Sequence, residues 1–290
     1  MEAADETDTK PIVSTSNENA AYSSKHRGSV VSAPHVQAAI RDDNYDTRNP
    51  KRGVALVINQ VNFKRMPRRD GSDRDRDSLC STFKSIGFDV RLCDDKTKVE
   101  VLTVLEETAA ESHAQNDCLV VVVMTHGEKD VLYASDGSYP IDHLWKPFVG
   151  NACKTLLGKP KLFFVQACRG ESLDKGVKYA RTVTDTVDAS GGQLVYAIPT
   201  MADLLVMYST YDGHYSWRNP INGSWYIQSL CLELKENAHS KELLQLLTAV
   251  SRRVAYEYQS NVPGNEAMDA KKQMPCIVSM LTKALYFPPK

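Results

Sequence analysis

Apolar runs of strand length recur through the middle of the chain. Runs of this length without polar alternation are typical of strands that are buried on both faces of a sheet. The alternating segment F-D-V-R-L-C (88–93) instead predicts a strand with one exposed face. The buried runs begin with G-V-A-L-V-I-N at Gly53 and continue at 119–124, 161–168, 203–210 and 276–287.

Helical segments separate these strands. The pattern predicts three helices, around Ser78 to Ile86, Lys98 to His113 and His143 to Val149, and then two more at about 223–237 and 240–259. A small hairpin is expected with Asp136-Gly137 at its turn. Strands that alternate with helices predict an α/β fold, in which helices flank a mainly parallel sheet on both sides.

Two stretches lack any such pattern. Residues 1 to about 48 are rich in Ser, Thr, Ala, Asn and Asp, so too little apolar surface is available to offset the entropy of ordering. This composition predicts a disordered leader. Residues 169–200 also show no sustained period, and a structureless loop of about 30 residues is unusual enough inside a compact domain to indicate a function.

Composition excludes several classes of protein. The 290 residues include 35 Lys and Arg against 36 Asp and Glu, so no global attraction to nucleic acid or anionic membranes is expected. The chain has no run of 18 apolar residues, and its acidic N-terminus lacks the apolar core of a secretory signal. The seven widely spaced cysteines include no C-x-x-C pair, which argues against a zinc ribbon and favours a reducing, cytoplasmic location.

Candidate chemistry follows the ends of the predicted strands, where parallel α/β sheets bind their ligands. The strand 119–124 runs into T-H-G-E with His126 and Gly127, and the strand 161–168 ends in Q-A-C-R-G with Cys168. A lone histidine or cysteine in such a place is most simply a structural residue. Together they meet the need of a cysteine nucleophile for a nearby base, and the glycine allows a backbone N–H to approach a substrate.

These motifs also carry a family resemblance. Q-A-C-R-G is typical of caspases. Four further motifs also match the family, and all five stand along the chain in the family's order. The other four are R-x-G at Arg69, M-T-H-G-E, Y-S-W-R-N with G-S-W-Y-I-Q-S-L, and K-K-Q-M-P-C-I-V-S-M-L. The chain resembles a caspase over about residues 49–290, and its short leader is similar to that of the effector (executioner) group. Its general character is similar to invertebrate members. His214 and Met268 depart from the family pattern, so the exact peptide preference stays open.

The resemblance implies a domain organisation. It predicts a three-layer α/β sandwich around a mainly parallel six-stranded sheet, continued across a homodimer through the last strand. It divides the chain into a propeptide (1–48), a large subunit (49–188, with the intersubunit linker from about 169) and a small subunit (189–290). Effector caspases are zymogens cut after aspartate, and the matching sites are Asp188 and Asp185 in the linker and Asp8 in the leader, with Asp46 a weaker match.

The resemblance also implies roles for single residues. Cys168 would be the nucleophile and His126 the base and acid, with the carbonyl of Pro67 orienting the imidazole. The backbone N–H groups of Gly127 and Cys168 would bind the oxyanion. The pocket for the substrate aspartate would be built from Arg69, Gln166, Arg218 and Ser216; Tyr215 and Trp217 would wall the next subsite, and Asn219 and Trp225 would lie near the fourth.

The residue types fit that chemistry, because two guanidinium groups and an amide suit one carboxylate. Without the resemblance, however, Arg69 would be interpreted as a solvated charge in a basic run. Arg68 is the other candidate for the same place in the pocket. Protein substrates with Asp before the scissile bond, an upstream initiator caspase and inhibitor-of-apoptosis proteins are the implied partners, with no cofactor or metal.

Three alternatives differ in their sequence requirements. A catalytically impaired homologue that acts by binding would not need Cys168, His126 and Arg218 together. A relative that cuts after Arg or Lys would need acidic residues in the pocket. A cysteine hydrolase of the α/β-hydrolase type would need G-x-C-x-G, and this chain has Gln166 at the first of those glycines.

Overall fold

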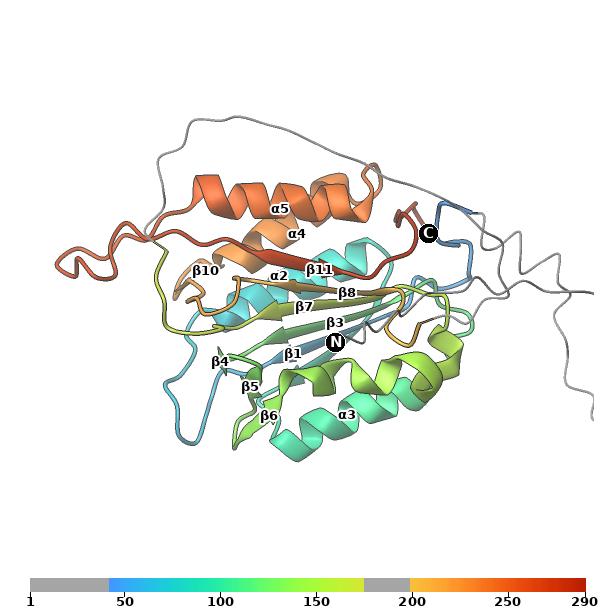
Figure 1. Cartoon of the computed structure of the whole chain (residues 1–290), viewed down its shortest axis with the longest axis horizontal. Helices are drawn as coiled ribbons and strands as arrows, with labels where there is room; N and C mark the ends of the chain where they lie inside the picture. Colours follow the sequence, from blue (N-terminus) through green and yellow to red (C-terminus); the bar gives the residue numbers. More distant parts are fainter. Residues whose placement is uncertain (1–41, 175–198) are drawn as a thin grey trace, which may run out of the picture. The chain divides into compact units, whose positions relative to one another are not determined.

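A computed structural model describes residues 42–174 and 199–290. Its centre is a six-stranded sheet with the order β11-β8-β7-β3-β1-β2 (Figure 1). Five strands are parallel, and β11 runs antiparallel to β8. The predicted mainly parallel sheet is thereby confirmed. The strands are β1 (Val54–Asn59), β2 (Asp89–Asp94), β3 (Leu119–Met124), β7 (Lys161–Gln166), β8 (Leu204–Tyr208) and β11 (Cys276–Ser279).

Helices cover both faces of this sheet (Figure 1). One hydrophobic core lies under α2 (Ser72–Ser85), α4 (Trp225–Asn237) and α5 (Leu243–Glu257). A second core lies under α3 (Lys98–Ala110) and three short 3-10 segments, η1 (Ile141–Leu144), η2 (Lys146–Phe148) and η3 (Gly150–Leu156). Every residue of β1, β3 and β7 is buried, because both faces of these central strands are covered.

Short strands follow the carboxyl ends of the central strands. A three-stranded antiparallel sheet consists of β4 (Gly127–Glu128), β5 (Val131–Tyr133) and β6 (Ser138–Pro140). A two-stranded sheet consists of β9 (Arg218–Asn219) and β10 (Gly223–Ser224). The turn at Asp136-Gly137 joins β5 to β6 as predicted. In the described part of the chain, no helix is long and apolar enough to cross a membrane.

Some predicted boundaries are wrong. Helix α2 begins at Ser72 rather than near Ser78, because its first turn is charged and shows no apolar period. The expected helix at 143–149 is a series of 3-10 turns. The last strand ends at Ser279 instead of continuing to 287, since Leu285 and Phe287 turn into the core beside α5.

The end of the predicted leader is part of the ordered domain. Tyr45 is only 6% exposed, its N–H donates to the Ala284 carbonyl (3.0 Å), and its hydroxyl donates to Asp203 Oδ1 (2.7 Å). The sequence pattern did not show this because a single tyrosine with distant partners has no periodicity. The domain therefore begins before Gly53, and residues 1–41 lie outside the described part.

Candidate active site

The sheet register places the candidate histidine and cysteine side by side. Strands β3 and β7 are neighbours, and Met124 pairs with Gln166 at their carboxyl ends. The ladder continues with the Thr125 N–H donating to the Gln166 carbonyl (3.0 Å). Two residues beyond these partners on each strand stand His126 and Cys168.

Gly127 shows how close the two backbones approach. A Cβ atom at this position would lie 2.6 Å from the Cys168 carbonyl oxygen and 2.9 Å from Ala167 Cβ. Such distances are shorter than non-bonded atoms tolerate, so only glycine fits. The glycine after the histidine is thus a packing requirement of the junction between β3 and β7.

His126 is oriented by a backbone carbonyl. Its Nε2 donates to the Pro67 carbonyl (2.8 Å), which can only accept. In the neutral ring Nδ1 is therefore the free acceptor. Burial lowers the pKa of His126, and the Arg69 and Arg218 charges lower that pKa further, against an opposing contribution from the Pro67 hydrogen bond. The imidazole is consequently in its basic form at neutral pH.

The Cys168 thiol contacts the segment that follows the long loop. Its Sγ accepts a hydrogen bond from the Ser216 N–H (3.4 Å) and lies 3.9 Å from the Ser216 carbonyl. Burial raises the pKa of Cys168, while the Ser216 N–H and the charges of Arg69 and Arg218 oppose that shift. The resting pair is thus a neutral thiol beside a neutral imidazole.

Two arginines with unused donors lie beside this pair. Arg69 is 1% exposed and donates from Nη1 to the Gln60 carbonyl (3.0 Å) and to Ser72 Oγ (2.8 Å), but its Nε has no partner. Arg218 donates from Nε to the Asp70 carbonyl (2.7 Å). Among the ion pairs of the described residues, none includes Arg69 or Arg218.

The surroundings of Arg69 favour an anionic ligand. Burial and the charge of Arg218 lower the pKa of Arg69 to about 9, so it stays a cation at neutral pH. Gln166, also buried, donates from Nε2 to Ser216 Oγ (2.8 Å). A half-turn of that amide would present its N–H groups to a ligand while the Ser216 hydroxyl donates to Oε1. The orphaned buried donor Nε of Arg69 fits a ligand carboxylate.

A row of aromatic rings begins next to Ser216. The ring centroids of Tyr215 and Trp217 lie 5.2 Å apart, those of Trp217 and Trp225 5.6 Å, and those of Trp225 and Tyr258 5.4 Å. Met268 packs against this row. Asn219 uses its side-chain oxygen to accept from the N–H groups of the next turn, at 2.8 and 2.9 Å. Tyr215, Trp217 and Trp225 thus form one row of rings, and Asn219 stabilises its own turn.

The sequence reasoning missed Asp75. This residue is fully buried in the first turn of α2, and it accepts hydrogen bonds from the N–H and hydroxyl of Ser224 and from Gln228 Nε2 (2.7 Å). Asp75 thus ties the helix that follows Arg69 to the segment that follows Arg218. The acidic first turn of a helix was the available signal, but α2 was predicted to begin after Asp75.

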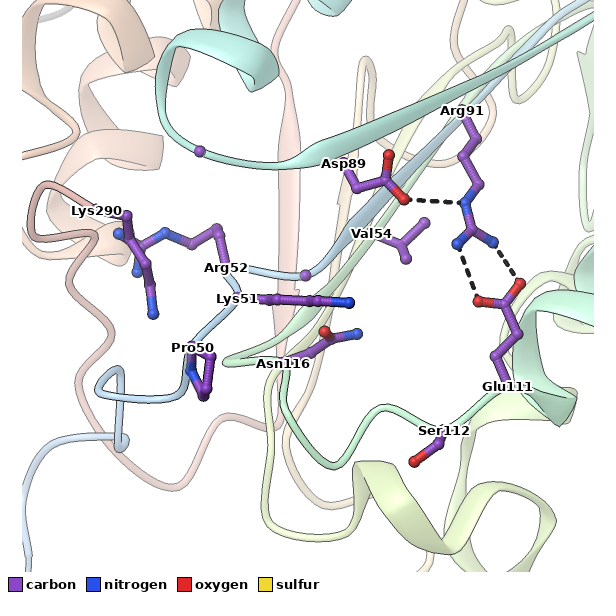
Figure 2. A pocket seen from close by; sticks show the side chains of 12 residues that line it. Pro50, Lys51, Arg52, Val54, Asp89, Arg91, Glu111, Ser112, Asn116 and Lys290 are labelled. Atoms are coloured by element: carbon purple, nitrogen blue, oxygen red, sulfur yellow. Dashed lines mark hydrogen bonds and ion pairs between the residues drawn. The ribbon is translucent and has the colours of Figure 1, made fainter.

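A separate cavity lies at the opposite, amino edge of the sheet. It has a volume of about 390 Å³, and Figure 2 shows Arg91 on its wall between Asp89 and Glu111. Arg91 donates to both carboxylates, at 3.3 Å and 2.9 Å, so its charge is already neutralised. Neither His126 nor Cys168 lines this cavity. In the described ranges, no cluster of His, Cys, Asp or Glu is arranged to hold a metal ion.

A cysteine and a histidine at adjacent strand ends of a covered α/β sheet, beside two cations, are the arrangement that a cysteine-dependent hydrolase requires. The sequence profile of the family described as "Caspase domain" matches residues 52–286. The chain belongs to the caspase family, and its relatives identify it as an effector caspase, a cysteine protease.

Individual relatives agree with this assignment. Caspase drICE of Drosophila melanogaster is 41% identical over 85% of this chain and 73% of its own length. Caspase-3 of Mesocricetus auratus is 43% identical over 85% of this chain and 87% of its own length. The crystal structure of caspase-1 from Spodoptera frugiperda superimposes with a TM-score of 0.80 at 40% identity, covering 86% of this chain and 97% of that one. Insect and vertebrate relatives are thus about equally similar.

Proposed function

We propose that this caspase cleaves proteins after aspartate, with a preference for D-x-x-D, during apoptosis. The observation that carries the proposal is the buried Arg69, whose Nε is unused, beside Arg218 and next to the junction of His126 and Cys168. A carboxylate is the ligand that satisfies two such cations, and a pocket for Arg or Lys would need the opposite charge.

The proposed chemistry follows from the hydrogen bonds. Cys168 Sγ attacks the substrate carbonyl carbon while the thiol proton passes to Nδ1 of His126. The carbonyl oxygen becomes an oxyanion between the backbone N–H groups of Gly127 and Cys168. The imidazolium, held through Nε2 by Pro67, returns the proton to the leaving amine. Water then hydrolyses the thioester and frees Cys168.

The same proposal assigns the subsites. Arg69, Gln166, Ser216 and Arg218 bind the aspartate side chain, and Tyr215 with Trp217 forms the wall for the preceding residue. Trp225 and the turn at Asn219 lie farther along the row of aromatic rings and would contact the fourth residue. The family relationship also points to a cytoplasmic enzyme, cut by an initiator caspase and bound by inhibitor-of-apoptosis proteins.

Cleavage of the intersubunit linker would free this site to settle around a substrate. The loop after Cys168 pairs with the small-subunit segment before Ser216: the Arg169 N–H donates to the His214 carbonyl (3.0 Å) and the Tyr215 N–H to the Ser172 carbonyl (2.9 Å). The proposed cut sites Asp185 and Asp188, like Asp8 in the leader, lie outside the described residues. We infer that an uncut linker limits how Arg169 and Ser216 settle around a substrate.

We therefore expect the double change Asp185→Ala and Asp188→Ala to give a soluble, uncut chain with at least about 10-fold lower kcat/KM on aspartyl peptides. Mass spectrometry of active wild type should show a large subunit that ends at one of these aspartates. Asp46→Ala is the control and should leave processing of the linker unchanged, because Asp46 lies far from the linker in the sequence and its exposed side chain pairs with Arg48. A double variant that is still cut within 169–200, or is fully active uncut, would contradict the proposal.

The edge of the sheet at β11 would form a homodimer. β11 has a strand neighbour on one side only within the described part of the chain, and Val278 is 44% exposed there. An uncovered apolar strand edge invites pairing with another copy.

We expect sedimentation of the processed wild type to give a dimer, and Val278→Glu to shift it to a monomer with most activity lost. Leu92→Glu is the matched control, because Leu92 is 45% exposed on β2 at the other edge of the sheet. A wild type that is strictly monomeric yet fully active would show that this edge does not serve as the interface.

A further inference from the structure

Phe63 is an aromatic residue in a polar loop that none of the hydrophobic cores uses. It lies between β1 and α2 in N-F-K-R-M-P-R (62–68), is half-buried, and belongs to none of the three core clusters of the described residues. Its ring instead contacts the imidazole of His126, with ring centroids 4.7 Å apart and planes inclined at 54°. A half-buried ring outside the hydrophobic cores gains little by packing alone, so its contact with His126 indicates a functional role.

The backbone on both sides of Phe63 is fixed. Asn62 donates from its N–H and its side chain to the carboxylate of Asp95, at 2.9 and 2.6 Å. On the other side, the Lys64 N–H donates to the Ser135 carbonyl (2.8 Å). Phe63 is thereby held against His126 by anchors on two other segments of the chain.

The same loop also holds the far side of the imidazole ring. Pro67, four residues after Phe63, accepts the hydrogen bond from His126 Nε2. A hydrogen bond fixes one atom of the ring but allows rotation about the line joining the two partners. A ring packed on the imidazole removes that freedom and keeps water from part of its surface.

We propose that Phe63 is a positioning residue for His126, which sets the plane of the imidazole and keeps it in the neutral, basic form. The inference rests on the proposed role of His126 as the base. The charged groups that act on the imidazole are the cations of Arg69 and Arg218, and both disfavour an imidazolium. Phe63 therefore adds to the effect of these cations by excluding the water that would solvate an imidazolium.

The proposal predicts a shift in the pH profile. Burial lowers the pKa of His126, so the wild-type kcat/KM should rise with pH through a midpoint below the ordinary histidine value of about 6.5. Phe63→Ala lets water reach the ring, stabilises the imidazolium and raises the pKa, so the acid limb should move to higher pH. We also expect kcat at pH 7.5 to fall about 10-fold or more while KM changes little, because the base is misplaced rather than the substrate pocket.

The experiment measures kcat and KM of the processed enzyme from pH 5 to 8.5 with an aspartyl tetrapeptide. Phe63→Tyr keeps an aromatic ring and should restore both kcat and the acid limb. Met66→Ala removes another apolar side chain of the same loop and should leave the pH profile unchanged. An unmoved acid limb in Phe63→Ala, or a loss confined to KM, would overturn the proposal.

One further variant separates this inference from the proposed mechanism. If His126→Ala keeps substantial turnover, His126 is not the base, and the proposed mechanism fails together with this inference. If His126→Ala is inactive and Phe63→Ala behaves as wild type, the mechanism stands and only the role of Phe63 is wrong.

Discussion

Replacing Cys168 by alanine is expected to abolish peptide cleavage, with a loss of kcat of about 10⁶-fold, as for removal of other catalytic nucleophiles. The hydroxyl of Thr125 at the same junction is buried and donates to the Tyr133 carbonyl, so it does not replace the thiol as a nucleophile. The fold should be retained, because alanine fits the space of the thiol and the Cys168 Sγ accepts only the 3.4 Å hydrogen bond from Ser216. Peptide turnover and thermal unfolding measure the two effects separately.

The matched control for this prediction is Cys80→Ala. Cys80 is also a partly exposed thiol, but it lies on α2, away from the carboxyl ends of the strands. Its replacement should leave kcat within about 2-fold of wild type. More than trace cleavage by a clean Cys168→Ala preparation would mean that another group attacks the substrate. An inactive wild type would revive the alternative of an impaired homologue that acts by binding.

The second large effect is discrimination against a substrate that lacks the carboxylate. Exchanging the aspartate before the scissile bond for asparagine should lower kcat/KM by about 10⁴-fold, because the two cations then stay unpaired in a buried pocket. The two side chains have nearly the same shape, so the comparison isolates the charge. Matched tetrapeptides and a continuous turnover assay give the ratio directly.

Arg218 provides the test of where this selectivity arises. Arg218→Ala should remove about 100-fold or more from the rate with the aspartyl peptide and leave the asparaginyl peptide almost unchanged, so the ratio collapses. Arg218→Lys keeps the positive charge but loses the planar guanidinium and its hydrogen bond to the Asp70 carbonyl. Its ratio of aspartyl to asparaginyl turnover should therefore lie between those of wild type and Arg218→Ala. An undiminished ratio in Arg218→Ala would place the carboxylate elsewhere.

The local pattern of apolar residues was sufficient to predict the central strands of the sheet. Continuous apolar runs identified β1, β3 and β7, because strands covered on both faces have no exposed position that would interrupt the run. The same runs located His126 and Cys168, since residues directly after buried parallel strands come out at one edge of the sheet. The charged start of α2 and the end of β11 were misjudged, because these segments depend on distant partners more than on their own periodicity.

The sequence by itself determined the class of fold, the family and the two residues proposed for the chemistry, because these depend on short contiguous motifs. Only the tertiary structure decided which charged residues are buried at the candidate site. Arg69 looks like a solvated residue among other arginines, yet the fold buries it to 1% exposure and leaves its Nε unpaired. Asp75 and Phe63 acquire their partners from residues 149 and 63 positions away, and no local pattern encodes such contacts. Burial and long-range contacts are properties of the assembled chain, and for that reason the polar environment of the site became visible only in three dimensions.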